Sequence, residues 1–240
     1  MSGSQEEARS DGPRFYGRRR GKRLRRSAVG LIEVMLPRLA ITVPKPGVML
    51  DPKELFPREV EQVWLEVGFG GGEHVVAQAR LHPEAGIIGS EPFRNGVASL
   101  LGHLNGAAAE GAAIDNVRIF PEDVRQLFPA LPEGALGRIF VLFPDPWPKK
   151  RHAERRFIGP ENLPELARLL ADGGELRVAS DDPVYAEWAD RHLKECALLE
   201  EVQTTQDRAA LPEDWPPTRY EQKCLANNPP TFFRYRRKAR

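Results

Sequence analysis

The sequence predicts an α/β protein with a doubly wound, mostly parallel sheet of seven strands. Three observations indicate this fold: short apolar runs alternate with helical stretches, a glycine-rich turn follows the first run, and acidic residues stand where the runs end. Parallel strands are predicted at residues 63–68, 86–91, 116–120, 137–143 and 174–180. Helices are predicted at residues 28–36, ending at Pro37, and at residues 73–81, 94–104, 122–128, 162–171 and 184–196. Two further strands, at residues 198–204 and 231–235, are expected to pair antiparallel at one edge of the sheet.

The first predicted strand ends in alternating glycines that open into a helix. Glu66 is followed by Gly68, Gly70 and Gly72. Glycine lets the backbone pass close to a ligand where a Cβ would clash, and the start of the helix offers free N–H groups. The dinucleotide fingerprint would need a glycine at position 73, which is Glu73. The pattern favours an adenosylmethionine loop, and hence a methyltransferase, over an NAD site; a plain tight turn is the alternative.

The next two predicted strands also end in carboxylates. Glu91 stands 25 residues after Glu66, about the spacing at which a nucleotide-binding βαβ unit places an acid on ribose hydroxyls. The alternative for Glu91 is a solvent-exposed residue at a strand end. After the third strand, Asp123 is a candidate acceptor for an adenine amino group, and capping of the next helix is its alternative role.

The fourth predicted strand runs into a loop of unusual composition. It reads Pro144-Asp145-Pro146-Trp147-Pro148-Lys149-Lys150-Arg151-His152. The prolines restrict the backbone, so the Asp145 carboxylate and the Trp147 indole are presented with little freedom. An aromatic ring beside an acid suits a flat base, and the cationic tract suits a phosphate backbone. The loop therefore predicts the chemical centre of a nucleic-acid enzyme, although proline-rich loops also occur for structural reasons alone.

Charge is distributed unevenly along the chain. Eight basic residues and no acid lie between Arg14 and Arg26, so the rest of the chain carries a net charge of −7 although the whole carries +1. A second basic cluster comprises Arg234, Arg236, Arg237, Lys238 and Arg240. Such clusters on an acidic body indicate contact with nucleic acid; a solubilising tail or a membrane-surface patch is the alternative. We expect a flexible basic arm at residues 1–26 and one cofactor-binding domain at residues 27–240.

Composition excludes several other classes of protein. The longest apolar run, at residues 139–143, is too short to span a bilayer, and the amino terminus lacks a secretory signal pattern, so a cytoplasmic protein is expected. Two cysteines 28 residues apart and scattered histidines predict no metal site. No obligate protein partner is indicated, and the chain is expected to be a monomer or a homodimer.

Four motifs together resemble those of the bacterial tRNA (guanine-N7)-methyltransferases. They are the glycine loop after Glu66, the Pro144 to His152 loop, Ser180-Asp181, and Thr218-Arg219-Tyr220-Glu221. The resemblance covers about residues 15–223, with Ser180 where threonine is common and Asp182 where an aromatic is common.

This resemblance implies a Rossmann-like class I methyltransferase that moves a methyl group from S-adenosylmethionine to N7 of guanine 46 in the variable loop of tRNA. It also implies roles for individual residues. Cofactor binding would fall to Glu66, Gly68, Gly70, Gly72, Glu91, Asp123 and Asp145, with Asp145 also catalytic, and tRNA binding to Lys149, Asp181, Thr218, Arg219, Tyr220 and Glu221.

Two other functions stay open on the sequence. Enzymes that methylate exocyclic amino groups carry an Asp-Pro-Pro-aromatic loop, whereas here a single proline separates Asp145 from Trp147. A tRNA-binding module with a vestigial cofactor site is the second alternative, and the intact glycine loop argues against it.

Overall fold

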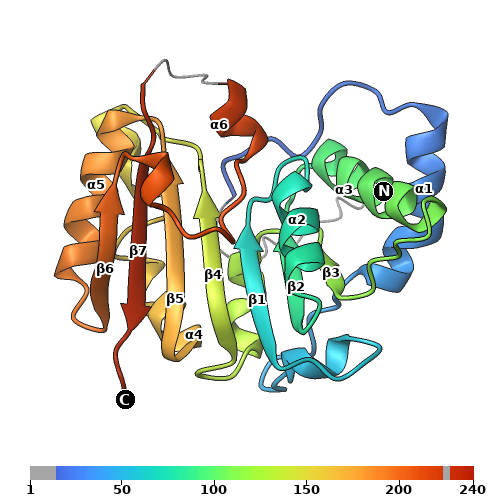
Figure 1. The fold of residues 1–240 in the computed structure, drawn as a ribbon, viewed down its shortest axis with the longest axis horizontal. Coiled ribbons are helices and arrows are strands. Elements are labelled where there is room, and N and C mark those ends of the chain that lie inside the picture. Colours follow the sequence, from blue (N-terminus) through green and yellow to red (C-terminus); the bar gives the residue numbers. More distant parts are fainter. Residues whose placement is uncertain (1–14, 224–227) are drawn as a thin grey trace, which may run out of the picture.

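One sheet of seven strands organises the residues that the computed structural model describes, 15–223 and 228–240 (Figure 1). The strands lie in the order β3-β2-β1-β4-β5-β7-β6. They are β1 (Gln62–Val67), β2 (Ala85–Ser90), β3 (Val117–Phe120), β4 (Leu136–Leu142), β5 (Leu170–Ser180), β6 (Leu199–Thr205) and β7 (Thr231–Arg237). Strands β1 to β5 pair in parallel, and β7 pairs antiparallel with β5 and β6. The predicted doubly wound, mostly parallel sheet of seven strands is confirmed.

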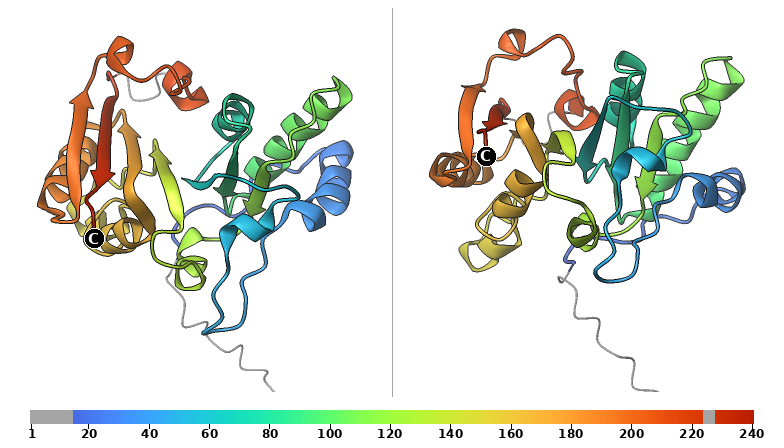
Figure 2. Two further views of the ribbon diagram at one scale, coloured as in Figure 1. Left: turned by 60° about the horizontal axis from the view of Figure 1, so that its bottom comes forward. Right: turned by 90° about the horizontal axis from the view of Figure 1, so that it is seen from below.

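Helices cover both faces of this sheet (Figures 1 and 2). They are α1 (Arg26–Leu39), α2 (Glu73–Leu81), α3 (Arg94–Ala109), α4 (Leu163–Leu169), α5 (Pro183–Glu195) and the short α6 (Arg219–Lys223). Successive strand residues point to opposite faces, so Trp64 belongs to the apolar cluster that includes α2 and α3, whereas Leu65 belongs to the one that includes α4 and α5. Burial on both faces explains why the parallel strands read as continuous apolar runs.

The helix predicted at residues 122–128 is wrong. Two 3-10 turns, Val124–Gln126 and Phe128–Ala130, occupy this region instead. Asp123 is extended, at φ −65° and ψ 120°, so a helix cannot run on from residue 122 through it. Pro129, just beyond the predicted end, has no N–H with which to continue a helix. The Asp123 carboxylate accepts a hydrogen bond from the Arg125 backbone N–H and so caps the first of the turns.

Several other boundaries differ from the prediction; helix α3, for example, continues to Ala109 instead of ending at residue 104. Helix α1 does not end at Pro37 but continues to Leu39, because a proline in the last turn removes only one hydrogen bond and the Ala40 N–H still donates to the Leu36 carbonyl. Strand β5 begins at Leu170, directly after α4, rather than at residue 174. Between the pairs Leu136–Leu170 and Arg138–Glu175, β5 advances five residues against two in β4, and this irregularity extends β5 back to Leu170.

The topology brings the predicted site residues to one edge of the sheet. The carboxyl ends of parallel strands meet at the same edge, and the strand order reverses between β1 and β4. Ligands of doubly wound proteins bind in the crevice at such a switch point. The glycine loop follows β1 and the Asp145 loop follows β4, so the two strongest motifs flank this crevice.

The carboxy-terminal basic cluster is tied into the body of the protein. Arg234 pairs with Glu175 at 2.7 Å, and Arg236 lies 3.9 Å from Glu200. Arg237 is buried and donates to the Ala167 carbonyl, Lys238 donates to the Ala197 carbonyl, and Arg240 pairs with Glu133 and Asp172. The cluster therefore joins β7 to neighbouring segments, and its charge alone is no indication of nucleic-acid contact.

Candidate active site

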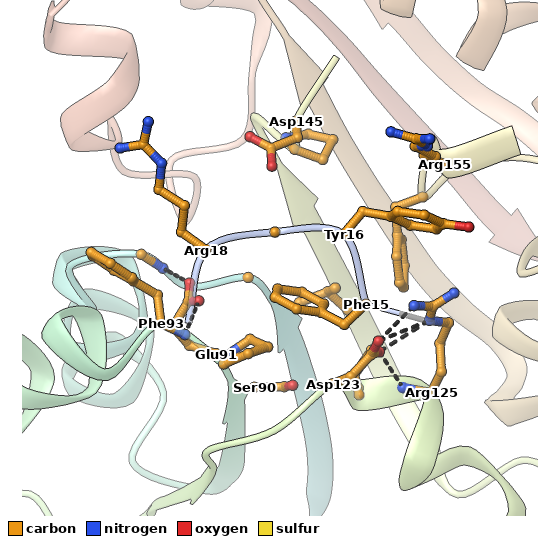
Figure 3. Close-up of a pocket in the computed structure, with 18 of the residues that line it drawn as sticks. Phe15, Tyr16, Arg18, Ser90, Glu91, Phe93, Asp123, Arg125, Asp145 and Arg155 are labelled. Carbon is orange, nitrogen blue, oxygen red and sulfur yellow. Dashed lines mark hydrogen bonds and ion pairs between the residues drawn. The ribbon is translucent and has the colours of Figure 1, made fainter. Parts of the chain in front are cut away.

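A cavity of about 590 Å³ opens at the carboxyl edge of the sheet (Figure 3). Six of the predicted site residues line it: Gly68, Gly70, Glu91, Asp123, Asp145 and Tyr220. They come from the segments that follow β1, β2, β3 and β4, and from α6. Residues far apart in the sequence are thus brought to one wall, as the strand-end argument predicts.

The glycine loop forms the floor of the cavity. Gly68, Gly70 and Gly72 have φ angles of 67°, 57° and 84°, in the left-handed region that glycine adopts without strain. A Cβ on Gly68 would meet no atom within 4 Å, so bare backbone faces open space there. Gly72 has a different role, because a Cβ there would lie 2.6 Å from Leu100 of α3; this glycine allows close helix packing rather than ligand approach.

Glu91 fixes the glycine loop from the neighbouring strand. Its Oε2 accepts a hydrogen bond from the Gly70 N–H and its Oε1 accepts one from the Phe93 N–H, both at 2.8 Å. Burial raises the pKa of Glu91, and the nearby carboxylates of Asp145 and Glu66 add to this rise while the two backbone donors oppose it. Each carboxylate oxygen keeps a second lone pair for a ligand hydroxyl.

Asp123 is paired within the protein. Its Oδ2 lies 2.6 Å from Arg125 Nη2, and its Oδ1 also accepts hydrogen bonds from the Arg125 backbone and Nε (Figure 3). This pair raises the pKa of the Arg125 guanidinium. The capping role that the sequence left open for Asp123 is therefore present in the structure, and a role toward adenine stays a prediction.

The Asp145 loop is strained on both sides of the carboxylate. Phe143 and Trp147 have φ angles of 52° and 42°, which are unfavourable for non-glycine residues. Both residues line the cavity together with Asp145. Backbone strain of this kind concentrates at functional sites and persists only where the surroundings hold it.

The predicted substrate residues divide into two groups. Thr218, Arg219, Tyr220 and Glu221 lie at the start of α6, where the Thr218 hydroxyl accepts from the Glu221 N–H in a capping arrangement. Tyr220 is half exposed, and its ring lies 3.1 Å from where a Cβ on Gly70 would be. Lys149 is exposed and Asp181 is partly buried after β5, and neither lines the cavity.

Glu66 lies beside the main cavity rather than on its wall. It is buried and its Oε2 lies 2.7 Å from Nδ1 of His74, which is also buried. Both residues line a small recess together with Thr218 and Arg219. His74 was not predicted from the sequence; its position eight residues after Glu66, on the first turn of α2, is the signal that points to the pair.

Sequence comparison identifies the family. A sequence model described as "Putative methyltransferase" matches residues 60–233. A tRNA (guanine-N(7)-)-methyltransferase of Paramagnetospirillum magneticum is 61% identical over 233 residues, which are 97% of this chain and 96% of the relative. This chain belongs to the tRNA (guanine-N7)-methyltransferase family. Another protein of that name, from Rhodospirillum rubrum, is 52% identical and covers 98% of this chain and 91% of its own length.

Solved structures support the fold expected of this family. The 16S rRNA methyltransferase KamB aligns with a TM-score of 0.53 over 75% of this chain and 89% of its own, at 16% sequence identity. At that identity the likeness concerns the fold alone. It confirms the Rossmann-like class I methyltransferase architecture implied by the motifs.

The amino-terminal arm of this chain runs across the cavity at the carboxyl edge of the sheet. Phe15, Tyr16, Gly17 and Arg18 line the cavity, and Figure 3 shows this segment passing between Asp145 and Asp123. Arg19 pairs with Glu122 at 2.6 Å. The site prediction did not include these residues, although the two aromatic residues at the edge of the basic run were a signal. Residues 1–14 of the predicted arm lie outside the described residues, and its flexibility stays a prediction.

The Trp147 ring is enclosed by aromatic and cationic neighbours. Tyr16 and His152 meet it edge-on, with ring centroids 6.2 Å and 5.8 Å away. The Arg155 guanidinium lies 5.0 Å from the Trp147 ring and 4.4 Å from that of Tyr16. The arm and the Asp145 loop therefore share one side-chain cluster at the mouth of the cavity.

The residues of the cavity fit an adenosylmethionine-like ligand. Gly68 has no side chain, so a ligand can approach its backbone closely. The buried carboxylate of Glu91, at the end of the neighbouring strand, has lone pairs that can accept hydrogen bonds from the ligand. Burial raises the pKa of Glu91, and like-charge repulsion from Asp145 and Glu66 adds to this rise; a cationic ligand would relieve that repulsion. Over residues 15–223 and 228–240 the structure has no cluster of three metal-ligating side chains. The same residues contain no helix long and apolar enough to span a membrane.

Proposed function

We propose that this protein transfers a methyl group from S-adenosylmethionine to N7 of guanine 46 in the variable loop of tRNA and forms 7-methylguanosine. The observation that carries the proposal is the cavity shared by the glycine loop, Glu91 and the strained loop of Asp145. Membership of the family identifies guanine as the base and N7 as the atom that is methylated. The position in the tRNA rests on the motif resemblance.

The cofactor side of the site consists of the walls formed by β1, β2 and β3. When bound, the cofactor supplies a methyl group on a positively charged sulfonium. We assign Glu91 to accept hydrogen bonds from the ribose hydroxyls and Gly68 and Gly70 to admit the ligand close to the backbone. Asp123 also lines this cavity. Glu66 acts from the adjoining recess, and Gly72 acts by allowing α2 to start close to α3.

The base side of the site lies between Asp145 and α6. Guanine N7 has an in-plane lone pair and needs no deprotonation, so the chain's task is to hold the base in line with the methyl group. Asp145 stabilises the positive charge that develops on the base, and only the part that exceeds ground-state attraction accelerates transfer. Tyr220, Trp147 and Tyr16 offer aromatic surfaces for the purine ring.

Binding of tRNA extends beyond the cavity. We assign phosphate contacts to the basic arm within residues 1–26 and to Lys149, with Asp181, Thr218, Arg219 and Glu221 on the same side. The acidic body would otherwise repel RNA. We expect the enzyme to consist of a cofactor-binding domain at residues 27–240 and the basic arm. We also expect it to be cytoplasmic, where its tRNA substrate is, and to act as a monomer or a homodimer.

The product nucleoside tests the proposed function directly. The protein is incubated with methyl-labelled adenosylmethionine and a tRNA transcript that carries guanine 46, the RNA is digested, and the labelled nucleoside is identified. We expect 7-methylguanosine, and none from a transcript with adenine at position 46. Label on an exocyclic amino group would favour the amino-methyltransferase alternative, and cofactor binding without transfer to any tRNA would favour a binding module.

Glu91 gives a prediction for pH. The carboxylate accepts hydrogen bonds only when ionised, and its pKa is raised, so cofactor affinity is expected to be full above that pKa and to fall as the pH drops through it. Glu91→Gln should weaken cofactor binding near neutral pH by about 1 to 3 kcal/mol, because the amide cannot accept from both backbone donors and serve the ligand. Calorimetric titration with adenosylmethionine over a pH series that runs from the ordinary pKa of glutamate up to neutral pH measures both effects.

Glu84→Gln is the matched control, since Glu84 is exposed and lies just before the opposite end of β2. It should bind cofactor as the wild type does at every pH. Wild-type and Glu91→Gln proteins with the same pH profile would remove Glu91 from the cofactor site.

A further inference from the structure

Arg156 lies directly behind the Asp145 loop. It follows the 3-10 helix Lys150–Arg155 and is only 6% exposed. Its Nε donates to the carbonyl oxygens of Pro146 and Trp147, at 3.1 Å and 3.3 Å, and its Nη2 donates to the Trp147 carbonyl at 3.0 Å. One guanidinium thus holds two consecutive peptide groups immediately after Asp145.

The partners of Arg156 are neutral. Within the described ranges no carboxylate lies within 4 Å of its guanidinium, which instead lies 4.8 Å from the ring of Trp188. The Trp188 indole is itself fixed, because its Nε1 donates to the Ile158 carbonyl at 2.6 Å. Burying a cation without a counter-ion costs free energy of folding. A folded protein therefore keeps such a residue only where its hydrogen bonds hold a structure that an apolar residue could not hold.

The two carbonyls belong to the strained part of the loop. Trp147 is in the left-handed region, at a φ of 42°, and it is flanked by Pro146 and Pro148. A non-glycine residue held there is strained and would relax if its peptide groups were released. Rotation of these peptides would turn the Trp147 ring and shift the backbone that carries Asp145. The planar guanidinium of Arg156, which donates to both carbonyls, opposes that rotation from the buried side of the loop.

We propose that Arg156 is a positioning residue: its guanidinium clamps the Pro146 and Trp147 carbonyls and thereby fixes Asp145 and Trp147 for methyl transfer. The inference rests on the proposed function for its effect on rate, and on the loop geometry alone for its effect on Trp147. A planar fork with Nε and Nη2 donors is needed to span two adjacent carbonyls, and the single ammonium of lysine cannot reproduce it.

Two variants and a matched control test the clamp. Arg156→Lys keeps the charge and removes the fork, and Arg156→Met removes both. Arg237→Met is the control, because Arg237 is also 6% exposed and its Nε donates to a backbone carbonyl, that of Ala167, outside the cavity lining. All three are compared with the wild type by thermal unfolding, adenosylmethionine and tRNA dissociation constants, and single-turnover methyl transfer at saturating substrates.

A readout independent of activity comes from the four tryptophans. In protein labelled with 5-fluorotryptophan, the Trp147 fluorine resonance is assigned with Trp147→Phe. We expect both Arg156 variants to shift or broaden that resonance and to slow single-turnover transfer by about 10- to 100-fold, as displaced catalytic groups do, with the cofactor dissociation constant within about twofold of wild type. Arg237→Met should lower the unfolding temperature and leave the Trp147 resonance and the rate unchanged.

The proposal is overturned if Arg156→Lys leaves the Trp147 resonance and the rate as in wild type, or if its rate falls no further than that of Arg237→Met. Should Arg156→Met fail to fold, the lysine variant alone decides. A wild-type protein that methylates no tRNA would overturn the proposed function instead, and the fluorine spectra would still decide whether Arg156 holds the loop.

Discussion

Asp145→Asn is expected to lower the single-turnover rate of methyl transfer by about 100- to 1,000-fold, the range seen when one preorganised electrostatic group is removed from a reacting centre. The substitution keeps the shape of the side chain and removes its charge. Positive charge moves from the cofactor to the purine during transfer, so a fixed carboxylate stabilises the later part of this path more than a neutral amide does. Rapid-quench measurement with excess enzyme isolates this step from product release.

The protein should stay folded when Asp145 is changed. The Asp145 side chain is exposed at the cavity mouth, and substitutions at exposed positions away from packed contacts usually change stability by only about 0.5 kcal/mol. Asp115→Asn is the matched control, since this exposed aspartate pairs with Arg58 just before the amino end of β3, away from the cavity lining. A rate for Asp145→Asn equal to that of the control would remove Asp145 from catalysis.

The sheet and its strand ends were predictable because their signals are local. Apolar runs, alternating glycines and Glu91 at its spacing each depend on neighbours in sequence, and parallel pairing then brings them to one edge. The helix predicted at residues 122–128 failed for a local reason as well: Asp123 is extended and caps a short 3-10 turn, which interrupts the helical pattern of apolar residues.

Contacts between distant segments were not predictable in the same way. Arg19 meets Glu122 across 103 positions, and Arg240 meets Glu133 across 107, so a basic run in the sequence does not reveal which charges are already paired. Arg156 lies within a run of basic residues that suggests phosphate contact, yet its guanidinium faces two carbonyls in the interior. Composition identifies the charge, and only the fold decides whether it faces water, an acid or the backbone.

The second large effect is expected from removing positive charge from the amino-terminal basic arm. Arg20, Lys22, Arg23 and Arg25 are exposed, and none of them has a carboxylate within 4 Å among residues 15–223 and 228–240. Changing these four to glutamine while keeping Phe15, Tyr16, Arg18 and Arg19 preserves the contacts of the arm with the cavity and the Glu122 pair. It removes only charge that is available for phosphates. We expect weaker tRNA binding and an unchanged adenosylmethionine dissociation constant.

The salt dependence of binding gives the size of this effect. If all four charges meet phosphates, the slope of log affinity against log salt should fall in magnitude by about 3, at about 0.7 to 0.9 per contact. Between 50 and 200 mM salt, the wild type should then lose about 60-fold more affinity than the variant, because a fourfold change in salt is raised to the third power. Binding of a tRNA transcript by filter retention or fluorescence anisotropy across that series measures both slopes.

The control removes charge from the other side of the molecule. Lys45 and Lys53 are exposed on the segment that precedes the amino end of β1, opposite the edge where the cavity opens. Lys45→Gln with Lys53→Gln should leave the slope close to that of the wild type, since those charges face away from the proposed tRNA surface. Equal slopes for the arm variant and the wild type would mean that the arm does not hold the RNA, whereas equal losses in arm and control would mean that net charge, not a defined surface, governs binding.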